Sequence, residues 1–269
     1  MQPLVMGVLN VTPDSFSDGG EYLDPERAIA HGLELVAEGA DVVDVGGEST
    51  RPGAEPVDEV EERRRVVPVV AALARQVRVS IDTRKAAVAE AAIEAGATLV
   101  NDVSASLHAV AAANGVGWVA MHMRGEPRTM QRGPTYHDVV TEVRDFLVER
   151  AEAAVAAGVD EVWIDPGFGF GKTAAHNLSL LKHLDVLVAT GFPVVAGTSR
   201  KAFIGRLMAR ATATAGGGPA DTVPTDDRLE GSVATAVWAM SQGVRMVRVH
   251  DVLVTVQAAQ VVTGKVVAR

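Results

Sequence analysis

The sequence predicts a single α/β domain over residues 1–269, folded as a (β/α)8 barrel. Short apolar segments alternate with amphipathic helical patterns along the chain, and eight such pairs can be counted. The apolar segments are nearly continuous, as in the run from Asp41 to Val45, which is typical of parallel strands buried on both faces. A chain of 269 residues has the length expected for eight such units in one barrel.

Local signals place the elements in order. The first strand covers residues 5–9, and Asp24 before Pro25 predicts the start of a helix that runs to residue 38. A strand at 41–45 precedes a helix to residue 75, which opens on a capping-box pattern from Asp58 to Glu61. Further strands are expected at 77–81, 98–100, 117–121, 161–164, 193–196 and 245–249. The remaining helices are expected at 85–95, 107–113, 137–157, 176–188, 200–208, 228–242 and 252–266.

An open, dinucleotide-binding sheet is the main alternative fold. That fold carries a glycine fingerprint that leads directly from the first strand into a helix. Here the first strand is followed by Asn-Val-Thr-Pro-Asp at residues 10–14, and the barrel is therefore favoured.

Composition restricts the classes of function. The formal net charge of −9 opposes non-specific binding to nucleic acid or to anionic membranes. The sequence contains no cysteine, which excludes disulfides, Cys-ligated zinc and a thiol nucleophile. No charged leader and no apolar run of the ~20 residues that span a bilayer can be recognised. We therefore expect a cytoplasmic enzyme that acts on small molecules and binds neither nucleic acid nor membrane.

A glycine-rich stretch, Asp-Pro-Gly-Phe-Gly-Phe-Gly-Lys-Thr at residues 165–173, follows the sixth predicted strand. Its three glycines permit positive φ and a close approach of the backbone to a ligand. The carboxylate of Asp165 at the strand end, with two aromatic rings behind it, suits a flat polar heterocycle. The structural alternative is a glycine-rich turn with a helix-capping aspartate. A P-loop is excluded, because Pro166 stands where that motif needs its first glycine.

Polar residues stand at the ends of all eight predicted strands, which is where a barrel carries its ligand site. One set offers carboxylates, an amide and an ammonium, and suits hydrogen bonding to a nitrogen-rich ring. Its members are Asp82, Asn101, Asp165 and Lys201. A second set is polar and cationic, and suits pyrophosphate with a Mg²⁺ ion helped by the Asn10 carbonyl oxygen. Its members are Asn10, Arg51, Arg248 and His250.

Each of these residues has a structural alternative. Asp82 could cap the following helix, Arg51 could be a solvated loop charge, and His250 could be structural. His122 and His176 are expected to be structural or to support other residues rather than to bind a ligand. The convergence of eight strand ends on one mouth favours a shared site.

Eight segments at these strand ends form a set that runs from the first strand to the eighth. They are GVLNVTPDSFSDG at 7–19, VGGESTRPGA at 45–54, SIDT at 80–83, VNDV at 100–103, MHMRG at 121–125, DPGFGFGK at 165–172, TSRK at 198–201 and VRVHD at 247–251. In this order they resemble the dihydropteroate synthases, and the resemblance covers essentially the whole chain. It implies a TIM barrel with long mobile loops after the first and second strands.

Members of that family join 6-hydroxymethyl-7,8-dihydropterin pyrophosphate to p-aminobenzoate in folate biosynthesis, giving 7,8-dihydropteroate and pyrophosphate. The resemblance thus implies a Mg²⁺-assisted transferase with two small-molecule substrates, a homodimer and a target of sulfonamides. Cations and Mg²⁺ would stabilise the departing pyrophosphate, and ionised Asp82 would stabilise the methylene cation that remains. The arylamine would then attack, so no protein nucleophile is needed.

The same resemblance assigns roles to single residues. The pterin ring would be held by Asp82, Asn101, Met121, Asp165, Lys201 and Arg248. Pyrophosphate would be bound by Asn10, Thr50, Arg51, Arg248 and His250, and Mg²⁺ by Asn10. p-Aminobenzoate would contact Phe16, Thr50, Arg51, Pro52, Phe170, Ser199 and Lys201. Catalysis would depend on Arg51, Asp82, Lys201 and Arg248, whereas Glu48 would order a loop rather than act as a base.

Two other functions are compatible with a similar barrel. A pterin-binding paralogue without turnover would lack residues of the first two loops, yet Asp14, Phe16 and residues 49–52 are all present. A pterin-handling methyltransferase that acts with a corrinoid partner would not need the Ser-Thr-Arg-Pro loop or the cations for pyrophosphate. The synthase is therefore favoured, and both of these functions remain alternatives to it.

Two segments depart from the family pattern. Residues 104–117 are short, which predicts a truncated helix after the fourth strand. Residues 209–225 include Ala-Gly-Gly-Gly-Pro-Ala and are expected to form a flexible surface excursion. Neither segment contains a matched site residue.

Overall fold

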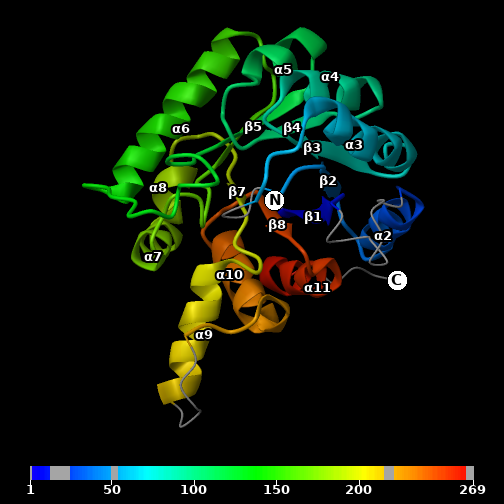
Figure 1. Cartoon of the computed structure of the whole chain (residues 1–269). Coiled ribbons are helices and arrows are strands. Elements are labelled where there is room, and N and C mark those ends of the chain that lie inside the picture. Colours follow the sequence, from blue (N-terminus) through cyan, green and yellow to red (C-terminus); the bar gives the residue numbers. More distant parts are fainter. Residues whose placement is uncertain (1, 13–24, 50–53, 215–220, 265–269) are drawn as a thin grey trace.

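Eight parallel strands form one sheet in the computed structural model, which describes residues 2–12, 25–49, 54–214 and 221–264. The strand order is β6-β5-β4-β3-β2-β1-β8-β7. The two outer strands meet through a bridge between Ile164 and Val194, and the Ile164 N–H donates to the Pro193 carbonyl oxygen at 3.0 Å. The sheet is therefore a nearly closed barrel with helices around it, as Figure 1 shows, and the predicted (β/α)8 fold is confirmed.

Strands and helices alternate along the described residues, from blue to red in Figure 1. The strands are β1 (Leu4–Asn10), β2 (Val42–Gly46), β3 (Arg78–Asp82), β4 (Leu99–Asp102), β5 (Gly117–Met121), β6 (Val162–Asp165), β7 (Val195–Ala196) and β8 (Met246–Val249). The helices are α2 (Pro25–Ala37), α3 (Glu59–Leu73), α4 (Ala86–Glu94), α5 (His108–Asn114), α6 (Val139–Ala156), α7 (Ala174–Lys182), α8 (Leu184–Val188), α9 (Ala202–Thr214), α10 (Leu229–Ser241) and α11 (Val252–Thr263), with a 3-10 helix η1 (Thr225–Asp227). None of the helices within these ranges is both long and apolar enough to cross a bilayer.

The apolar core has a large layer between the sheet and the helices and a smaller cluster, drawn mainly from strand residues, apart from it. The smaller cluster draws on the first halves of most strands. Its buried members are Met6, Val42, Leu99, Val119, Trp163, Val195 and Met246. Apolar side chains thus fill the barrel at the amino ends of the strands. The polar residues that the sequence places late in the strands lie at the opposite, carboxyl ends.

The short helix expected after the fourth strand is confirmed, since α5 has seven residues. The single helix expected at 176–188 is wrong. His183 leaves the helical conformation, with φ −114° and ψ 35°, and its Nδ1 lies 2.8 Å from the Ser179 carbonyl oxygen. The chain therefore forms two shorter helices, α7 and α8, on either side of it.

The flexible excursion expected at 209–225 is wrong for its first six residues, because α9 continues to Thr214. Alanine and arginine are strong helix formers, and they alternate with threonine from residue 209 onward. Thr212 and Thr214 donate hydrogen bonds to carbonyl oxygens one turn earlier. Residues 215–220 lie outside the described residues, whereas α9 itself projects from the body of the molecule (yellow in Figure 1).

Candidate active site

A cluster of charged and amide side chains lies at the carboxyl ends of β2, β3, β4 and β8. The Arg248 guanidinium bridges two carboxylates: Nε donates to Asp44 Oδ2 at 2.6 Å and Nη2 donates to Asp82 Oδ2 at 2.7 Å. Asn101 Nδ2 donates to the same Asp44 oxygen at 2.9 Å. The parallel register pairs Asp82 with Gly46 on one side and with Asn101 on the other. Three of the predicted ring-binding and catalytic residues are thus brought together.

Asp44 lies at the centre of this cluster, although the sequence analysis did not single it out. Its side chain is fully buried at 0% exposure, and Oδ1 has no hydrogen-bond partner among the described residues. The missed signal is a charged residue inside the apolar run Val-Val-Asp-Val, because a buried charge needs a partner. An unpaired, buried carboxylate oxygen is suited to accept a hydrogen bond from a ligand N–H group.

Charge in the cluster is set by burial and by close neighbours. Burial raises the pKa of Asp82 to about 7; Arg248 opposes this rise, and the negative charges of Asp44 and Glu62 add to it. Burial lowers the pKa of Arg248, but the two carboxylates outweigh burial and hold that pKa above its usual range. The guanidinium therefore keeps its charge, while Asp82 can exchange a proton near neutral pH.

Asp165 ends β6 close to this cluster. Its Oδ1 accepts a hydrogen bond from the Gly167 N–H at 2.7 Å. Burial raises the pKa of Asp165, and this effect outweighs the Gly167 bond and the positive charges of Lys201 and Arg248. Asp165 thus does not cap α7; that helix is capped by Thr173 instead.

The predicted ring-binding and p-aminobenzoate residues Lys201, Phe170 and Met121 lie together. The Lys201 Nζ stands 4.1 Å from the centroid of the Phe170 ring, within range of a cation–π contact. Phe170 is buried against Met121, Val103 and Met130. An ammonium over a buried aromatic ring provides a charged and an apolar surface side by side.

Ser199 and His250 form a further pair. The Ser199 Oγ lies 3.1 Å from His250 Nδ1 and accepts the His250 backbone N–H at 3.2 Å. The turn that directly follows Ser199 is strained, because Arg200 has a φ of 58°. Arg200 Nη2 donates to Asp251 Oδ1 at 2.6 Å, and the Arg200 N–H donates to Ser232 Oγ at 3.0 Å. These contacts hold the turn that carries Ser199 and Lys201.

The glycine-rich loop after β6 has the expected positive φ values, 63° at Gly167 and 62° at Gly171. A Cβ atom at Gly167 would lie 2.0 Å from the His122 carbonyl oxygen, and one at Gly171 would lie 2.2 Å from that of Arg124. The close approach that needs glycine at these two positions is therefore to the segment after β5 and not to a ligand.

The two histidines near this loop make structural contacts, which agrees with the supporting role expected for them. His176 and Thr173 form a capping box at the start of α7. The His122 Nδ1 lies 2.9 Å from Lys172 Nζ beneath the loop. Burial lowers the pKa of His122 to about 3, and the charge of Lys172 adds to this, so the ring is neutral at physiological pH.

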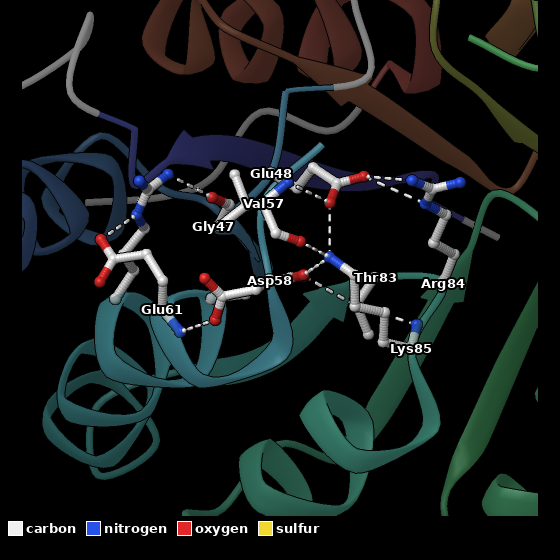
Figure 2. Close-up of polar contacts among 10 residues, drawn as sticks. Gly47, Glu48, Val57, Asp58, Glu61, Thr83, Arg84 and Lys85 are labelled. Carbon is white, nitrogen blue, oxygen red and sulfur yellow. Dashed lines mark hydrogen bonds and ion pairs between the residues drawn. The ribbon is translucent and has the colours of Figure 1, made fainter. Parts of the chain in front are cut away.

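Glu48 and Lys85 tie together the two ends of the segment between β2 and α3 (Figure 2). Glu48 accepts hydrogen bonds from the Val57 N–H at 3.1 Å, from Arg84 Nε at 3.0 Å and from Lys85 Nζ at 2.5 Å. Lys85 Nζ also donates to the Val57 carbonyl oxygen at 2.7 Å and to Glu62. Burial raises the pKa of Glu48, but these partners outweigh burial and hold the pKa below its usual value. This arrangement agrees with a loop-ordering role and not with a base.

Asp58 caps α3 as predicted, because its Oδ1 accepts the Glu61 N–H at 2.9 Å. The reciprocal bond of a capping box is replaced by ion pairs of the Glu61 side chain with Arg64 and Arg65. Asn10 ends β1 beside Gly46. The predicted site residues Phe16, Thr50, Arg51 and Pro52, together with Asp14, lie outside the described residues.

A barrel interior that passes from apolar side chains to buried carboxylates, an amide and a guanidinium at its mouth has the character of an enzyme that recognises a flat heterocycle. Comparison with known proteins narrows this class. The model of the pterin binding enzyme family matches residues 6–250. A dihydropteroate synthase of Mycobacterium leprae is 50% identical over 267 residues, covering 96% of this chain and 92% of the relative.

Solved structures agree with the family match. A dihydropteroate synthase of Xanthomonas albilineans with 4-aminobenzoic acid is 47% identical, covers 98% of this chain and 93% of its own, and superposes with a TM-score of 0.87. A dihydropteroate synthase of Yersinia pestis in complex with a sulfonamide drug is 45% identical, with 98% and 94% coverage and a TM-score of 0.87. The chain therefore belongs to the pterin-binding enzymes, and within them to the dihydropteroate synthases, a group of transferases in folate biosynthesis.

Proposed function

We propose that this chain condenses 6-hydroxymethyl-7,8-dihydropterin pyrophosphate with p-aminobenzoate, releasing pyrophosphate and 7,8-dihydropteroate. The observation that carries the proposal is the buried cluster in which Arg248 bridges Asp44 and Asp82 beside Asn101. The related Xanthomonas protein contains 4-aminobenzoic acid, which supports p-aminobenzoate as the second substrate.

The cluster suits the edge of a pterin, which presents an amino group and ring N–H donors next to a carbonyl acceptor. Asp44 Oδ1 and the carboxylate of Asp165 would accept from the donors, and Asn101 or Lys201 would donate to the acceptors. The raised pKa of Asp82, about 7, leaves an ionised fraction at neutral pH that would stabilise the cation formed on the methylene group. The Arg248 guanidinium, held by two carboxylates, would lie flat against the ring.

Departure of pyrophosphate requires positive charge near its oxygens. A Mg²⁺ ion, when bound, would supply part of that charge. Within the described ranges no group of three or more His, Cys, Asp or Glu side chains could hold a metal. The family resemblance implies Asn10 as one protein ligand, and phosphate oxygens and water would complete the coordination, as is common for Mg²⁺. His250 and Arg51 would bind the leaving group, and Phe170 with Lys201 would receive the arylamine.

The proposal is tested by product formation. Purified protein is mixed with the dihydropterin pyrophosphate, p-aminobenzoate and Mg²⁺, and 7,8-dihydropteroate is quantified. Lys201→Met should lower kcat/KM by about 100-fold or more, because it removes a charged donor from the site. Lys182→Met, at an exposed position on α7, is the matched control and should leave it unchanged. Pterin binding without turnover would favour the non-catalytic paralogue, and absence of both would contradict the proposal.

Three expectations follow from family membership. A sulfonamide should compete with p-aminobenzoate, as the drug complex of the Yersinia relative suggests. If a large excess of drug leaves turnover unchanged, that expectation fails. We further propose a homodimer, to be checked by light scattering, and a cytoplasmic location, to be checked by fractionation.

A further inference from the structure

Lys172 is deeply buried in the loop that follows β6. Lys172 is 2% exposed, and its Nζ lies within hydrogen-bonding distance of four polar atoms. Three are carbonyl oxygens, of His122 at 3.1 Å, Gly167 at 3.0 Å and Phe170 at 3.0 Å. The fourth is His122 Nδ1 at 2.9 Å. None of these four atoms belongs to a carboxylate, so these contacts of Lys172 are not those of a buried ion pair.

These contacts join two segments of the barrel mouth. His122 follows β5, whereas Gly167 and Phe170 follow β6, and the two strands are paired through Met121 and Asp165. The glycine positions show that the segments lie too close together for side chains between their backbones. Three carbonyl oxygens then point at one small space, where their partial negative charges would repel one another. The amino group of Lys172 donates hydrogen bonds to these oxygens.

Three other residues hold the backbone of the same loop at Gly169 and Gly171. Gln131 Nε2 donates to the Gly169 carbonyl oxygen at 2.5 Å, and Asn177 Oδ1 accepts the Gly169 N–H at 2.7 Å. The Tyr136 hydroxyl donates to the Gly171 carbonyl oxygen at 2.9 Å. Lys172 thus supports the loop from the side of His122, and Phe170 on the same loop lies beneath Lys201.

The loop connects Lys172 to two site residues, to Phe170 by one hydrogen bond and to Asp165 by two. Lys172 holds the carbonyl group of Phe170, whose ring lies under Lys201. Lys172 also holds Gly167, whose N–H fixes Asp165 Oδ1. Asp165 is anchored independently in β6, whereas Phe170 has no strand to hold it. Loss of the ammonium should therefore displace Phe170 more than Asp165.

We propose that Lys172 is a positioning residue of the reaction: its side-chain amino group fixes the loop after β6 and so holds the Phe170 ring beneath Lys201, where the arylamine is received. This inference rests on the proposed function. Lys172 touches neither substrate, because it lies under the loop. Since a displacement of about 1 Å can cost about 100-fold in rate, the effect on p-aminobenzoate should be large.

The test compares Lys172→Met with Lys182→Met in the full-length protein. Lys172→Met should raise KM for p-aminobenzoate by about 10- to 100-fold, while the dissociation constant of the dihydropterin pyrophosphate changes less than about threefold. Lys182→Met should change neither. Equal losses for both substrates, or no change in a folded Lys172→Met protein, would overturn the proposal.

A chemical rescue separates positioning from general damage. The chain contains no cysteine, so Lys172→Cys introduces a single thiol. Alkylation with 2-bromoethylamine in denaturant, followed by refolding, forms a C–S bond with loss of bromide and rebuilds a lysine-like ammonium. Activity towards p-aminobenzoate should recover in the aminoethylated protein and not in protein alkylated with iodoacetamide. Equal activity of the two products would overturn the proposal.

A second readout does not depend on turnover. Incorporation of 4-fluorophenylalanine gives six ¹⁹F sites, and Phe170→Leu identifies the resonance of Phe170. Lys172→Met should shift or broaden that resonance and leave in place that of Phe192, which packs against the main core cluster. A changed resonance in a protein that makes no dihydropteroate would refute the proposed function but keep the positioning role. An unchanged resonance would refute the positioning role itself.

Discussion

Two lysines, Lys85 and Lys172, lie under loops at the barrel mouth and are surrounded in opposite ways. Lys85 donates to the carboxylates of Glu48 and Glu62 and to one carbonyl oxygen. Lys172 donates to three carbonyl oxygens and lies against a neutral histidine. Both connect segments that follow neighbouring strands, β2 with β3 in one case and β5 with β6 in the other.

The partners decide the charge that each site can carry. Burial lowers the pKa of Lys85, but its hydrogen bonds to the carboxylates of Glu48 and Glu62 outweigh burial and raise that pKa above its usual value. Burial lowers the pKa of Lys172 to about 7, and Asp165 opposes this without reversing it. Burial alone therefore does not determine whether a lysine stays charged; formal negative charge in contact with it does.

The largest effect is expected from Lys85→Met. It would leave Glu48 and Glu62 buried beside each other without their shared cation, and breaking a buried pair in this way costs about 3–5 kcal/mol. Urea unfolding at neutral pH should show this loss of stability. The double variant Glu62→Gln with Lys85→Met should recover part of it, because one buried charge is removed. A loss below about 1 kcal/mol in the single variant would show that the network is solvated.

Gly171→Ala tests the close packing that creates the carbonyl site of Lys172. The new Cβ would meet the Arg124 carbonyl oxygen at 2.2 Å, in addition to the strain of φ 62°. Gly115→Ala is the matched control, since it has φ 63° and nothing within 4 Å. The control should cost about 1–2 kcal/mol from conformation alone, and Gly171→Ala about 1–3 kcal/mol more. Equal losses in thermal unfolding would mean that the two segments can move apart.

These positions also show what could be predicted from the sequence. Parallel strands, strand-end polar residues and the glycines with positive φ follow from local patterns, and Asp82, Asn101 and Arg248 were placed correctly at one mouth. Asp44 was missed, because strand periodicity does not reveal which residue of a buried strand faces a guanidinium from β8. The P-loop pattern does not fit around Lys172, and local patterns do not reveal its actual role, because one of its three carbonyl acceptors belongs to His122, 50 residues away. Such contacts depend on tertiary packing, which local patterns do not encode.

A pH series distinguishes the two lysines directly. The pKa of Lys172 is about 7 in the folded protein, against 10.5 for an ordinary lysine. Between these values the unfolded chain binds more protons than the folded one, so the contribution of Lys172 to stability rises with pH. The stability of the original protein minus that of Lys172→Met should therefore increase above pH 7, by at most about 1.4 kcal/mol per pH unit. Below pH 7 the difference should become constant. A flat difference above pH 7 would show that Lys172 keeps its proton.

The smallest effect is expected from Arg78→Met, at the amino end of the barrel. Arg78 makes two hydrogen bonds to Glu161, at 2.6 Å and 2.9 Å, but the side chains are 30% and 39% exposed. Solvent screens such a pair, and Glu161 keeps a bond from Trp163 Nε1 at 2.6 Å. Arg78→Met should therefore cost about 1 kcal/mol or less in urea unfolding and leave KM for p-aminobenzoate unchanged. A change in that KM would mean that a charge at the amino end of the barrel affects binding at the carboxyl end. The effects of the Lys85 and Lys172 variants could then not be assigned to local contacts.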